Sequence, residues 1–339
     1  MMQRSARMKD VAMAAGVSVM TVSRAFKKDA SVKQATRAAI MKAADELGYV
    51  YDSTAANLRS QKTDFVAVLI PSLNNANFAD TVGGLAPILS DQGLQVLLGY
   101  TNYDIEEEER LVEQLLRRRP EAIVLTGGRH TARTRRLLQA AAIPVIETWD
   151  LPEDPVDRVV GFSNAAAMGM MVDHLVGQGH GRIAFIGGDT DGDTRGADRR
   201  RGFLSAMAAH GLDASRLIGA GRPPISMREG ADAMVRLLDG YPGTEAVICI
   251  SDLSAFGALT ECARRGLSVP GDIVIAGFGA YEIADICVPR LTTIDPHPAR
   301  IGQATAQMII DVLTGRPAPP RIDVTPTLIV TESTAIGQG

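Results

Sequence analysis

The chain has 339 residues and a mass of 36.0 kDa, which is enough for two or three domains with sizeable apolar cores. Hydrophobic residues make up 46% of it and charged residues 22%, a composition that fits a soluble globular protein and excludes a disordered or fibrous one. No apolar run approaches the roughly 18 residues that span a bilayer. No signal peptide is recognised, so we expect a cytoplasmic protein. The three cysteines form no C-x-x-C pair, which favours a reducing compartment and argues against a cysteine zinc site.

Charge is divided unevenly along the chain. Residues 1–62 carry a net charge of +6, whereas residues 63–339 carry −10. A small basic segment ahead of an acidic body is typical of a head that binds a polyanion such as nucleic acid. On charge alone, a positive surface without a partner is an equally good explanation.

The pattern within residues 1–52 predicts a helix-turn-helix head. Residues 8–15 and 19–26 are predicted as two short helices, and Gly16 between them can take the left-handed conformation that a tight interhelical turn needs. Residues 34–47 have apolar side chains at helical spacing and supply a third, supporting helix. Together with the positive charge, this order of helices indicates a DNA-binding module rather than an ordinary three-helix cap.

The exposed face of the second helix carries side chains that suit a DNA groove. Arg24 can bind a guanine edge through two hydrogen bonds, and Met20 can contact apolar base surface. The hydroxyl groups of Thr21 and Ser23 can reach phosphates, and Lys27 extends the same face.

The head resembles the DNA-binding domain of the LacI/GalR family of bacterial repressors. The resemblance is carried by KDVAMAAGVSVMTVSRAF at 9–26 and TRAAIMKAADELGY at 36–49. It implies that the second helix enters the major groove of double-stranded operator DNA. The residues implied in contact with bases are Val19, Met20 and Arg24, and those in contact with phosphates are Thr21, Ser23 and Arg37. Because Val19 and Met20 are apolar where other members often form hydrogen bonds, the operator sequence does not carry over from relatives.

Residues 53–63 form a short polar segment with little to bury, which predicts a hinge between head and body. Its centre nevertheless has fair helix propensity. In the resembled family this stretch becomes a helix on DNA, and two such helices pair in the minor groove. The resemblance places Ala55 and Leu58 in that contact, with Leu58 wedged between base pairs. Pairing two hinges requires a homodimer and a pseudo-palindromic operator.

The body, residues 64–339, alternates short apolar strands with amphipathic helices. This order predicts parallel sheets covered on both faces, and therefore an α/β fold. The strand candidates are 65–70, 95–100, 122–125, 144–148, 183–188, 246–251 and 272–278. The helix candidates are 78–92, 105–118, 133–141, 165–177, 199–210, 228–238 and 254–265. Since the segment is too long for one such sheet, we expect two lobes.

The resemblance extends to the body, where it implies the two-lobed type I periplasmic-binding-protein fold. It places an N-lobe at about 64–162 and 295–322 and a C-lobe at about 163–290 and 326–339, with three crossings between them. Ligands of such parallel sheets bind at the carboxyl ends of the strands. We therefore expect a small effector molecule between the lobes.

Two arginines are the first candidates for contact with that molecule. The segment DTRGADRRRGF at 193–203 places Arg195 and Arg199 one turn apart at the start of a helix, where guanidinium groups and the helix N-terminus favour an anion. A solvated basic face is the ordinary alternative. In the resembled family the contacting arginine lies three residues before a Gly-aromatic pair, which selects Arg199 here. We expect Arg200 and Arg201 to face solvent.

Trp149, the only tryptophan, falls at a pocket position of the family, where its indole could stack on the C–H face of a sugar or polyol; burial in the lobe core is the alternative. The blocks around Trp149 and Arg199 resemble most closely the gluconate-utilisation repressors, which implies a sugar acid such as gluconate as the effector. Further candidates are an apolar wall at Phe78 and hydroxyl-pairing groups at Asp150, Asn164, Ser251 and Asp252. Gly279 stands where many members have an acidic residue, which is consistent with an acidic ligand.

Metal, cofactor and catalytic motifs are not recognised in the sequence. GGDTDGDT at 187–194 resembles a calcium loop, but Arg200 stands at its twelfth position and cannot bind calcium. The five histidines lack metal-ligand spacing, and there is no nucleophile elbow, Walker A loop or dinucleotide-binding loop. We therefore expect a ligand-responsive repressor without enzymatic activity or cofactor, acting as a homodimer on DNA. The alternatives are a regulator whose affinity for DNA increases when its ligand binds, a sugar-acid enzyme and a solute-binding protein.

Overall fold

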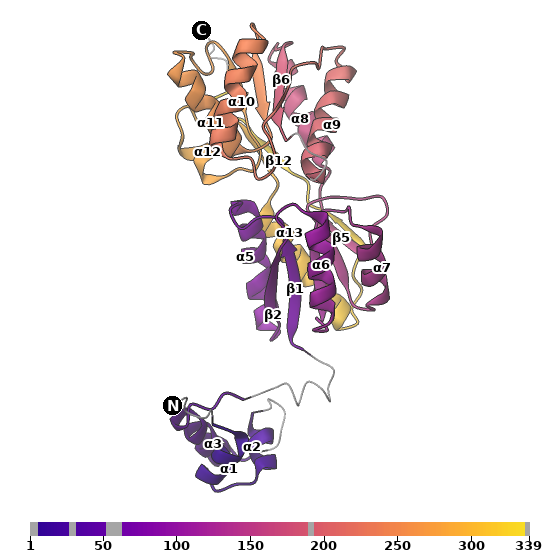
Figure 1. The fold of residues 1–339 in the computed structure, drawn as a ribbon, viewed down its shortest axis with the longest axis vertical. Helices are drawn as coiled ribbons and strands as arrows, with labels where there is room; N and C mark the ends of the chain where they lie inside the picture. Colours follow the sequence, from indigo (N-terminus) through magenta and orange to yellow (C-terminus); the bar gives the residue numbers. More distant parts are fainter. Residues whose placement is uncertain (1–5, 27–31, 52–62, 189–192, 336–339) are drawn as a thin grey trace. The chain divides into compact units, whose positions relative to one another are not determined.

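The computed structural model describes residues 6–26, 32–51, 63–188 and 193–335. The chain forms two compact units, Met1–Lys62 and Thr63–Gly339, each with its own apolar core (Figure 1). Lys27, Ala55 and Leu58, for which DNA contacts are expected, lie outside the described residues. None of the described helices is both long enough and apolar enough to cross a membrane.

The first unit contains the predicted helix-turn-helix. Its helices are α1 (Met8–Ala14), α2 (Val19–Ala25) and α3 (Gln34–Glu46). Val11, Val22 and Ile40, one from each helix, are fully buried against one another. Gly16 has φ +64°, as the tight turn between α1 and α2 requires, and the Ser18 side chain caps α2 by accepting from the backbone N–H of Thr21 at 3.2 Å. The head prediction is confirmed at this level.

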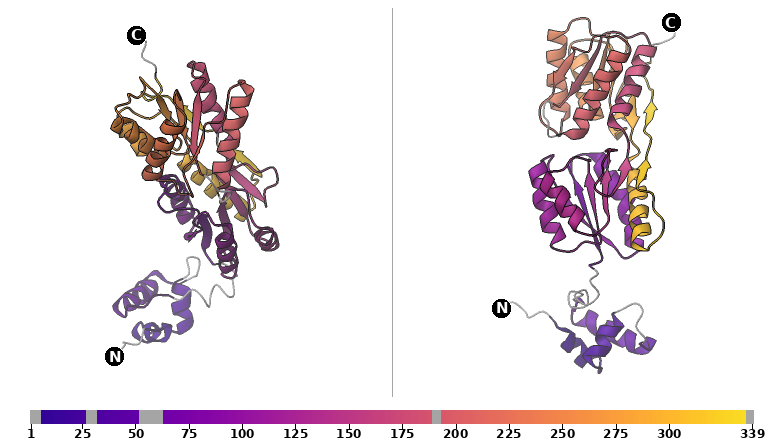
Figure 2. Two further views of the ribbon diagram at one scale, coloured as in Figure 1. Left: turned by 45° about the horizontal axis from the view of Figure 1, so that its top comes forward. Right: turned by 90° about the vertical axis from the view of Figure 1, so that its right-hand side faces the viewer.

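The N-lobe of the second unit is a six-stranded parallel sheet with helices on both faces (Figures 1 and 2). Its strand order is β11-β5-β4-β3-β1-β2, with β1 at Phe65–Ile70, β2 at Gln95–Tyr100, β3 at Ala122–Thr126, β4 at Val145–Thr148, β5 at Arg158–Gly161 and β11 at Arg321–Asp323. Helix α5 (Ala76–Asp91) packs against α13 (Pro298–Leu313) on one face, and α6 (Ile105–Leu116) packs against α7 (Ala132–Ala140) on the other. Because β2 and β3 lie on opposite sides of β1, the direction of winding reverses there, and a crevice forms at the carboxyl ends.

The C-lobe repeats this plan with a four-stranded parallel sheet in the order β7-β6-β8-β9. The strands are β6 (Ile183–Gly187), β7 (Leu217–Gly219), β8 (Ala246–Cys249) and β9 (Val274–Ala276). The helices are α8 (Asn164–Gly177), α9 (Thr194–Ala209), α10 (Met227–Gly240), α11 (Asp252–Arg264) and the short α12 (Glu282–Ile286). Helix α8 packs on α9, and α10 packs on α11. Winding reverses between β6 and β8, so this lobe also presents a crevice at its carboxyl ends.

The chain passes between the lobes three times. The first passage leads from β5 to α8, and the other two run beside each other as β10 (Thr293–Asp295) and β12 (Thr327–Ile329), which pair antiparallel. After the second passage, α13 and β11 return to the N-lobe. Both crevices therefore face the region where these connections lie.

The predicted strands and helices are present, and the α/β class is confirmed. Helix α9 begins at Thr194, five residues before the predicted start at 199. The structure also contains elements that the sequence pattern does not predict, namely β5, β7, α12, β10, α13, β11 and β12. Four of these lie in or beside the passages between the lobes, where the regular βα alternation ends.

Candidate functional site

A cleft lies between the N-lobe and the C-lobe, at the carboxyl ends of both sheets. Of the sequence-predicted residues it brings together Phe78, Trp149, Arg195, Arg199 and Ser251. Phe78 lies in the first turn of α5, Trp149 follows β4, Ser251 follows β8, and both arginines lie in the first two turns of α9. The topology thus unites positions that lie more than 170 residues apart in sequence. The site is therefore a crevice of the kind in which parallel α/β sheets bind small molecules.

Arg199 is held in the cleft by neutral groups. Its Nε donates to Asn164 Oδ1 at 3.0 Å, and its Nη1 donates to the backbone oxygen of Ile250 at 3.0 Å. The guanidinium carbon lies 3.6 Å from the centroid of the Phe278 ring, in a cation–π contact. Burial lowers the pKa of Arg199 to about 10, so it is still charged at neutral pH. A charged guanidinium without an ion pair among the described residues attracts an anionic ligand.

Arg195 is the second cation of the cleft and is 6% exposed. Its Nη1 donates to the backbone oxygen of Thr126 in the N-lobe at 3.2 Å, and its Nη2 lies 3.9 Å from Asp193 Oδ1. The guanidinium also lies 5.5 Å from the Phe78 ring and 5.8 Å from the Tyr103 ring. Arg195 thus connects the two lobes and adds positive potential to the same wall as Arg199.

Trp149 lines the cleft but is 2% exposed, so it belongs to the lobe core as well. Its Nε1 donates to Thr81 Oγ1 at 3.1 Å, and its ring meets those of Phe78 and Phe162 edge to face, at centroid distances of 5.3 and 5.9 Å. This packing fixes the indole in one orientation. The ring therefore forms a rigid apolar wall of the cleft.

Three of the predicted hydroxyl-pairing residues do not line the cleft, and two of these, Asn164 and Asp252, bond to lining residues and hold them in place. Asn164 bonds both Arg199 and the backbone oxygen of Trp149, the latter at 2.9 Å. Asp252 is fully buried and accepts from the Thr293 hydroxyl at 2.6 Å and from the Tyr281 N–H at 2.8 Å; burial raises its pKa to about 6. Asp150 accepts from the Leu151 N–H at 2.8 Å, and burial raises its pKa.

Sequence reasoning missed most of the polar lining that faces these arginines. The residues concerned are Asn74, Asn75, Asn77, Tyr103, Asp193 and Tyr281. The Tyr281 hydroxyl donates to Asn75 Oδ1 at 2.8 Å and so closes one side of the cleft between the lobes. Burial raises the pKa of both Tyr103 and Tyr281 above the usual 10, which keeps their hydroxyl groups protonated. They lie on the segments that follow the carboxyl ends of β1, β2, β6 and β9, and that placement is the signal that could have found them.

The head presents the predicted second helix to solvent. Met20 is 66% exposed and Val19 39%, and Arg24 is exposed beside them. The Thr21 and Ser23 side chains are half-buried, and the Thr21 hydroxyl lies 2.9 Å from that of Ser18. Arg37 is also half-buried, and its guanidinium donates to the backbone oxygen of Ala25 at the end of α2. It therefore stabilises the end of that helix, whatever its contact with DNA.

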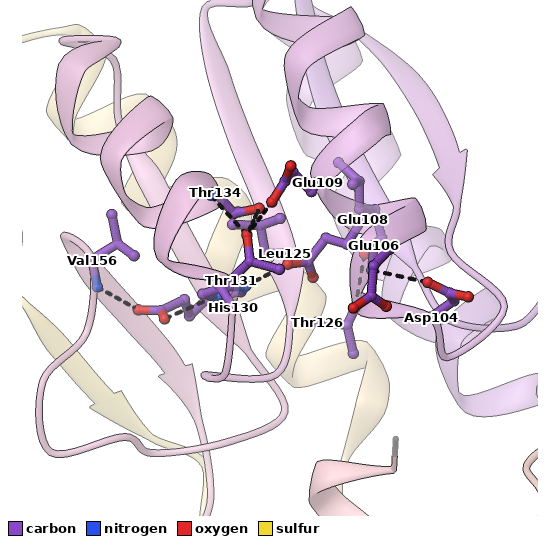
Figure 3. Close-up of polar contacts among 12 residues, drawn as sticks. Asp104, Glu106, Glu108, Glu109, Leu125, Thr126, His130, Thr131, Thr134 and Val156 are labelled. Atoms are coloured by element: carbon purple, nitrogen blue, oxygen red, sulfur yellow. Dashed lines mark hydrogen bonds and ion pairs between the residues drawn. The ribbon is translucent and has the colours of Figure 1, made fainter. Parts of the chain in front are cut away.

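A second polar cluster lies in the N-lobe, on the loop after β3. The fully buried His130 side chain bonds Glu108 Oε1 of α6 at 2.6 Å and Glu147 Oε1 of β4 at 3.1 Å, and Glu147 Oε2 accepts from the Val156 N–H at 2.8 Å (Figure 3). Burial opposes the charge of His130, but the two carboxylates outweigh it and raise its pKa to about 9. The neighbouring Arg129 reaches Asp198 of α9 at 3.3 Å, so this loop is fixed to both lobes. The described residues contain no group of His, Cys, Asp and Glu side chains that could hold a metal ion.

Comparison with known proteins agrees with this architecture. The family model "Bacterial regulatory proteins, lacI family" matches residues 7–52, and "Periplasmic binding protein-like domain" matches residues 172–334. The chain is 36% identical to the HTH-type transcriptional regulator GntR of Pseudomonas aeruginosa over 309 residues, which cover 91% of this chain and 90% of that protein. It is 34% identical to the HTH-type transcriptional regulator IdnR of Escherichia coli over 304 residues, covering 89% and 90%. A solved structure of a LacI-family transcriptional regulator from Silicibacter pomeroyi superimposes with a TM-score of 0.92 at 32% identity, over 97% of this chain and 99% of that one.

A helix-turn-helix head followed by a two-lobed, periplasmic-binding-protein-like body defines a DNA-binding transcriptional regulator and not an enzyme. The chain belongs to the LacI family of bacterial regulatory proteins.

Proposed function

We propose that the protein represses genes for the use of a sugar acid, and that a gluconate-type effector releases it from its operator. The observation that carries this proposal is the pair of arginines in the cleft; among the described residues, the hydrogen-bond partners of Arg199 are all neutral. A carboxylate can bind a guanidinium through two charge-assisted hydrogen bonds. The similarity to the regulators GntR and IdnR supports the same interpretation.

The rest of the cleft suits the polyol part of such a ligand. The rigid faces of Trp149 and Phe78 offer apolar contact to C–H groups, while Ser251, Asn75 and the Tyr281 hydroxyl offer hydrogen bonds to hydroxyl groups. Asn164 and Asp252 act by orienting this lining. A neutral sugar lacks the carboxylate, so it leaves the charge of Arg199 without a partner and binds more weakly.

On the DNA side, we propose that α2 enters the major groove. Val19, Met20 and Arg24 contact bases, while Thr21, Ser23, Lys27 and Arg37 contact phosphates. Two hinges pair in the minor groove through Ala55 and Leu58, which makes the acting species a cytoplasmic homodimer on a pseudo-palindromic operator. The exposed, apolar Val19 and Met20 favour contact with thymine methyl groups over hydrogen-bonded readout.

The cleft provides a means of coupling ligand binding to DNA binding. Contacts that cross it, from Arg195 to Thr126, from Arg129 to Asp198 and from Tyr281 to Asn75, depend on how closely the lobes approach. A ligand that bonds both lobes favours one approach over another, and it weakens DNA binding if that approach disfavours paired hinges.

Operator binding measured with and without gluconate tests this proposal. We expect gluconate, but not glucose, to lower the affinity of the full chain for DNA from its own upstream region. Tightening by gluconate would replace induction with a co-repressor mechanism. Specific DNA binding without any response to gluconate would remove the proposed effector.

A further inference from the structure

The body carries an exposed arginine turn, residues 117–119, at the point where the chain enters from the hinge. The three arginines follow α6 directly, and all are exposed. Thr63, the last residue of the predicted hinge, donates from its hydroxyl to the Arg119 backbone oxygen at 2.6 Å. The Thr63 N–H donates to Glu121 Oε1 at 2.6 Å. The entry of the hinge chain is therefore fixed to this turn.

Two of these guanidinium groups are available to a partner. Arg117 forms an ion pair with Glu113 at 2.6 Å, one helical turn back. Within the described part of the chain, Arg118 and Arg119 form no ion pair and no side-chain hydrogen bond. Glu121, the carboxylate next to the turn, already accepts from the N–H groups of Thr63 and Asp64.

The turn lies at the opposite end of the N-lobe from the cleft. The turn precedes β3 and Thr63 precedes β1, so both lie where the strands of the parallel sheet begin, at their amino-terminal ends. The cleft residues follow the carboxyl ends of the same strands. A change at Arg118 or Arg119 therefore leaves the lining of the cleft intact.

We infer that Arg118 and Arg119 bind backbone phosphates of the DNA to which the head is bound. Residues 52–62 are the covalent link between the head and Thr63, and eleven extended residues span at most about 40 Å. Residues 63–339 carry a net charge of −10, which by itself repels DNA held so close. Unpaired arginines at the entry point offset this repulsion locally and bind phosphates without reading sequence.

The salt dependence of DNA binding tests this inference. Full-length Arg118→Ala/Arg119→Ala is titrated, without effector, onto a duplex selected from a random-sequence pool by the wild-type protein, at several salt concentrations. Each phosphate that the variant no longer neutralises makes the negative slope of log K against log salt shallower by about 0.9, and at 0.1 M salt weakens binding about eightfold. We expect a shallower slope and a similar weakening on a non-operator duplex, with an unchanged unfolding midpoint.

Matched variants separate this contact from a general effect of charge. Arg200→Ala/Arg201→Ala removes the same two charges from exposed positions of α9 in the C-lobe. We expect that variant to keep the wild-type slope, and Arg118→Lys/Arg119→Lys to keep it too, because the charge is retained. An unchanged slope in Arg118→Ala/Arg119→Ala, or an equal fall in the α9 variant, would overturn the inference. Neither result depends on which ligand the cleft binds.

Discussion

At the scale of single residues, the chemistry of the cleft is concentrated in Arg199. Its Nε and Nη1 are held by Asn164 and Ile250, and its ring contact with Phe278 fixes the plane of the guanidinium. A preorganised guanidinium loses little conformational freedom when it binds a carboxylate. A lysine ammonium lacks the planar group with two parallel N–H donors that a carboxylate can bind.

The first prediction is that Arg199→Ala removes the response to a sugar acid while leaving operator affinity unchanged. Loss of a hydrogen bond to a charged group costs roughly 1.5–3 kcal/mol, or about 10- to 100-fold in effector affinity. Arg199→Lys should be impaired almost as much, and Arg200→Ala should behave as wild type. Calorimetric titration with gluconate gives the affinity, and anisotropy gives DNA binding. Equal loss of both activities would count against a role in ligand binding.

His130 makes stability depend on pH in a definite direction. Because its folded pKa of about 9 lies above the ordinary 6.5, its contribution is fully present below pH 6.5 and is lost as the pH rises through 9. The shift corresponds to something on the order of 3 kcal/mol. His174 and His180, whose pKa values burial lowers, affect stability only below this window.

The second prediction is therefore that the unfolding free energy of the wild-type chain falls between pH 6.5 and 9, and that His130→Gln abolishes most of this fall. Glutamine can still donate to one carboxylate but does not titrate. Urea unfolding at several pH values between these limits measures the slope. The same slope in both proteins would show that another group is responsible.

At the scale of elements, close helix packing sets the position of the arginines. Gly202 of α9 lies against the backbone of Ala165 in α8, and a Cβ at that position would overlap it. Helix α9 carries Arg195 and Arg199, so the α8–α9 spacing determines how far they reach into the cleft.

The third prediction concerns this spacing. Gly202→Ala should destabilise the body by about 1–3 kcal/mol through overpacking and weaken effector binding as well. Gly169→Ala in α8 is the matched control: no atom outside its own helix lies within 4 Å of a Cβ there, so it should stabilise the helix by roughly 0.5–1 kcal/mol. Denaturant unfolding of the two variants compares them. Similar effects at both glycines would contradict the packing argument.

The fourth prediction concerns the hinge, another single element, and it is made from the sequence. Leu58→Ala should weaken operator binding about 10- to 100-fold, since a buried leucine contributes about 1.5–3 kcal/mol. Binding to non-operator DNA and to the effector should hardly change. Fluorescence anisotropy with operator and non-operator duplexes separates these cases. Unchanged operator affinity would contradict the proposed insertion of Leu58 between base pairs.

Elements with strong apolar patterns could be predicted, and weakly patterned ones could not. The strands β1 and β2 match their predicted bounds because apolar runs end in clear turns. Helix α13 is the exception: Ile301, Thr305, Met308 and Ile309 recur at helical spacing on its buried face, so its pattern is present in the sequence although the helix was not predicted. The start of α9 was missed because TRGAD, at 194–198, contains no apolar residue larger than alanine.

At the scale of the whole molecule, the topology assembles a site that no local pattern reveals. Asn75 and Tyr281 are 206 positions apart and bond across the cleft. The cationic half of the site was predicted because both arginines lie on one helix within one short segment. The opposing polar half comes from several loops, so it becomes visible only once both sheets are folded.

The proposed mechanism couples the body to the head: a sugar acid bound in the cleft releases the head from DNA. The most direct measurement is fluorescence anisotropy of a labelled duplex from the upstream region, titrated with full-length protein in the presence of gluconate, of glucose and of neither. We predict that gluconate lowers the apparent affinity by at least about fivefold, the lower end of typical allosteric couplings, and that glucose does not. Equal affinity under all three conditions would contradict the account.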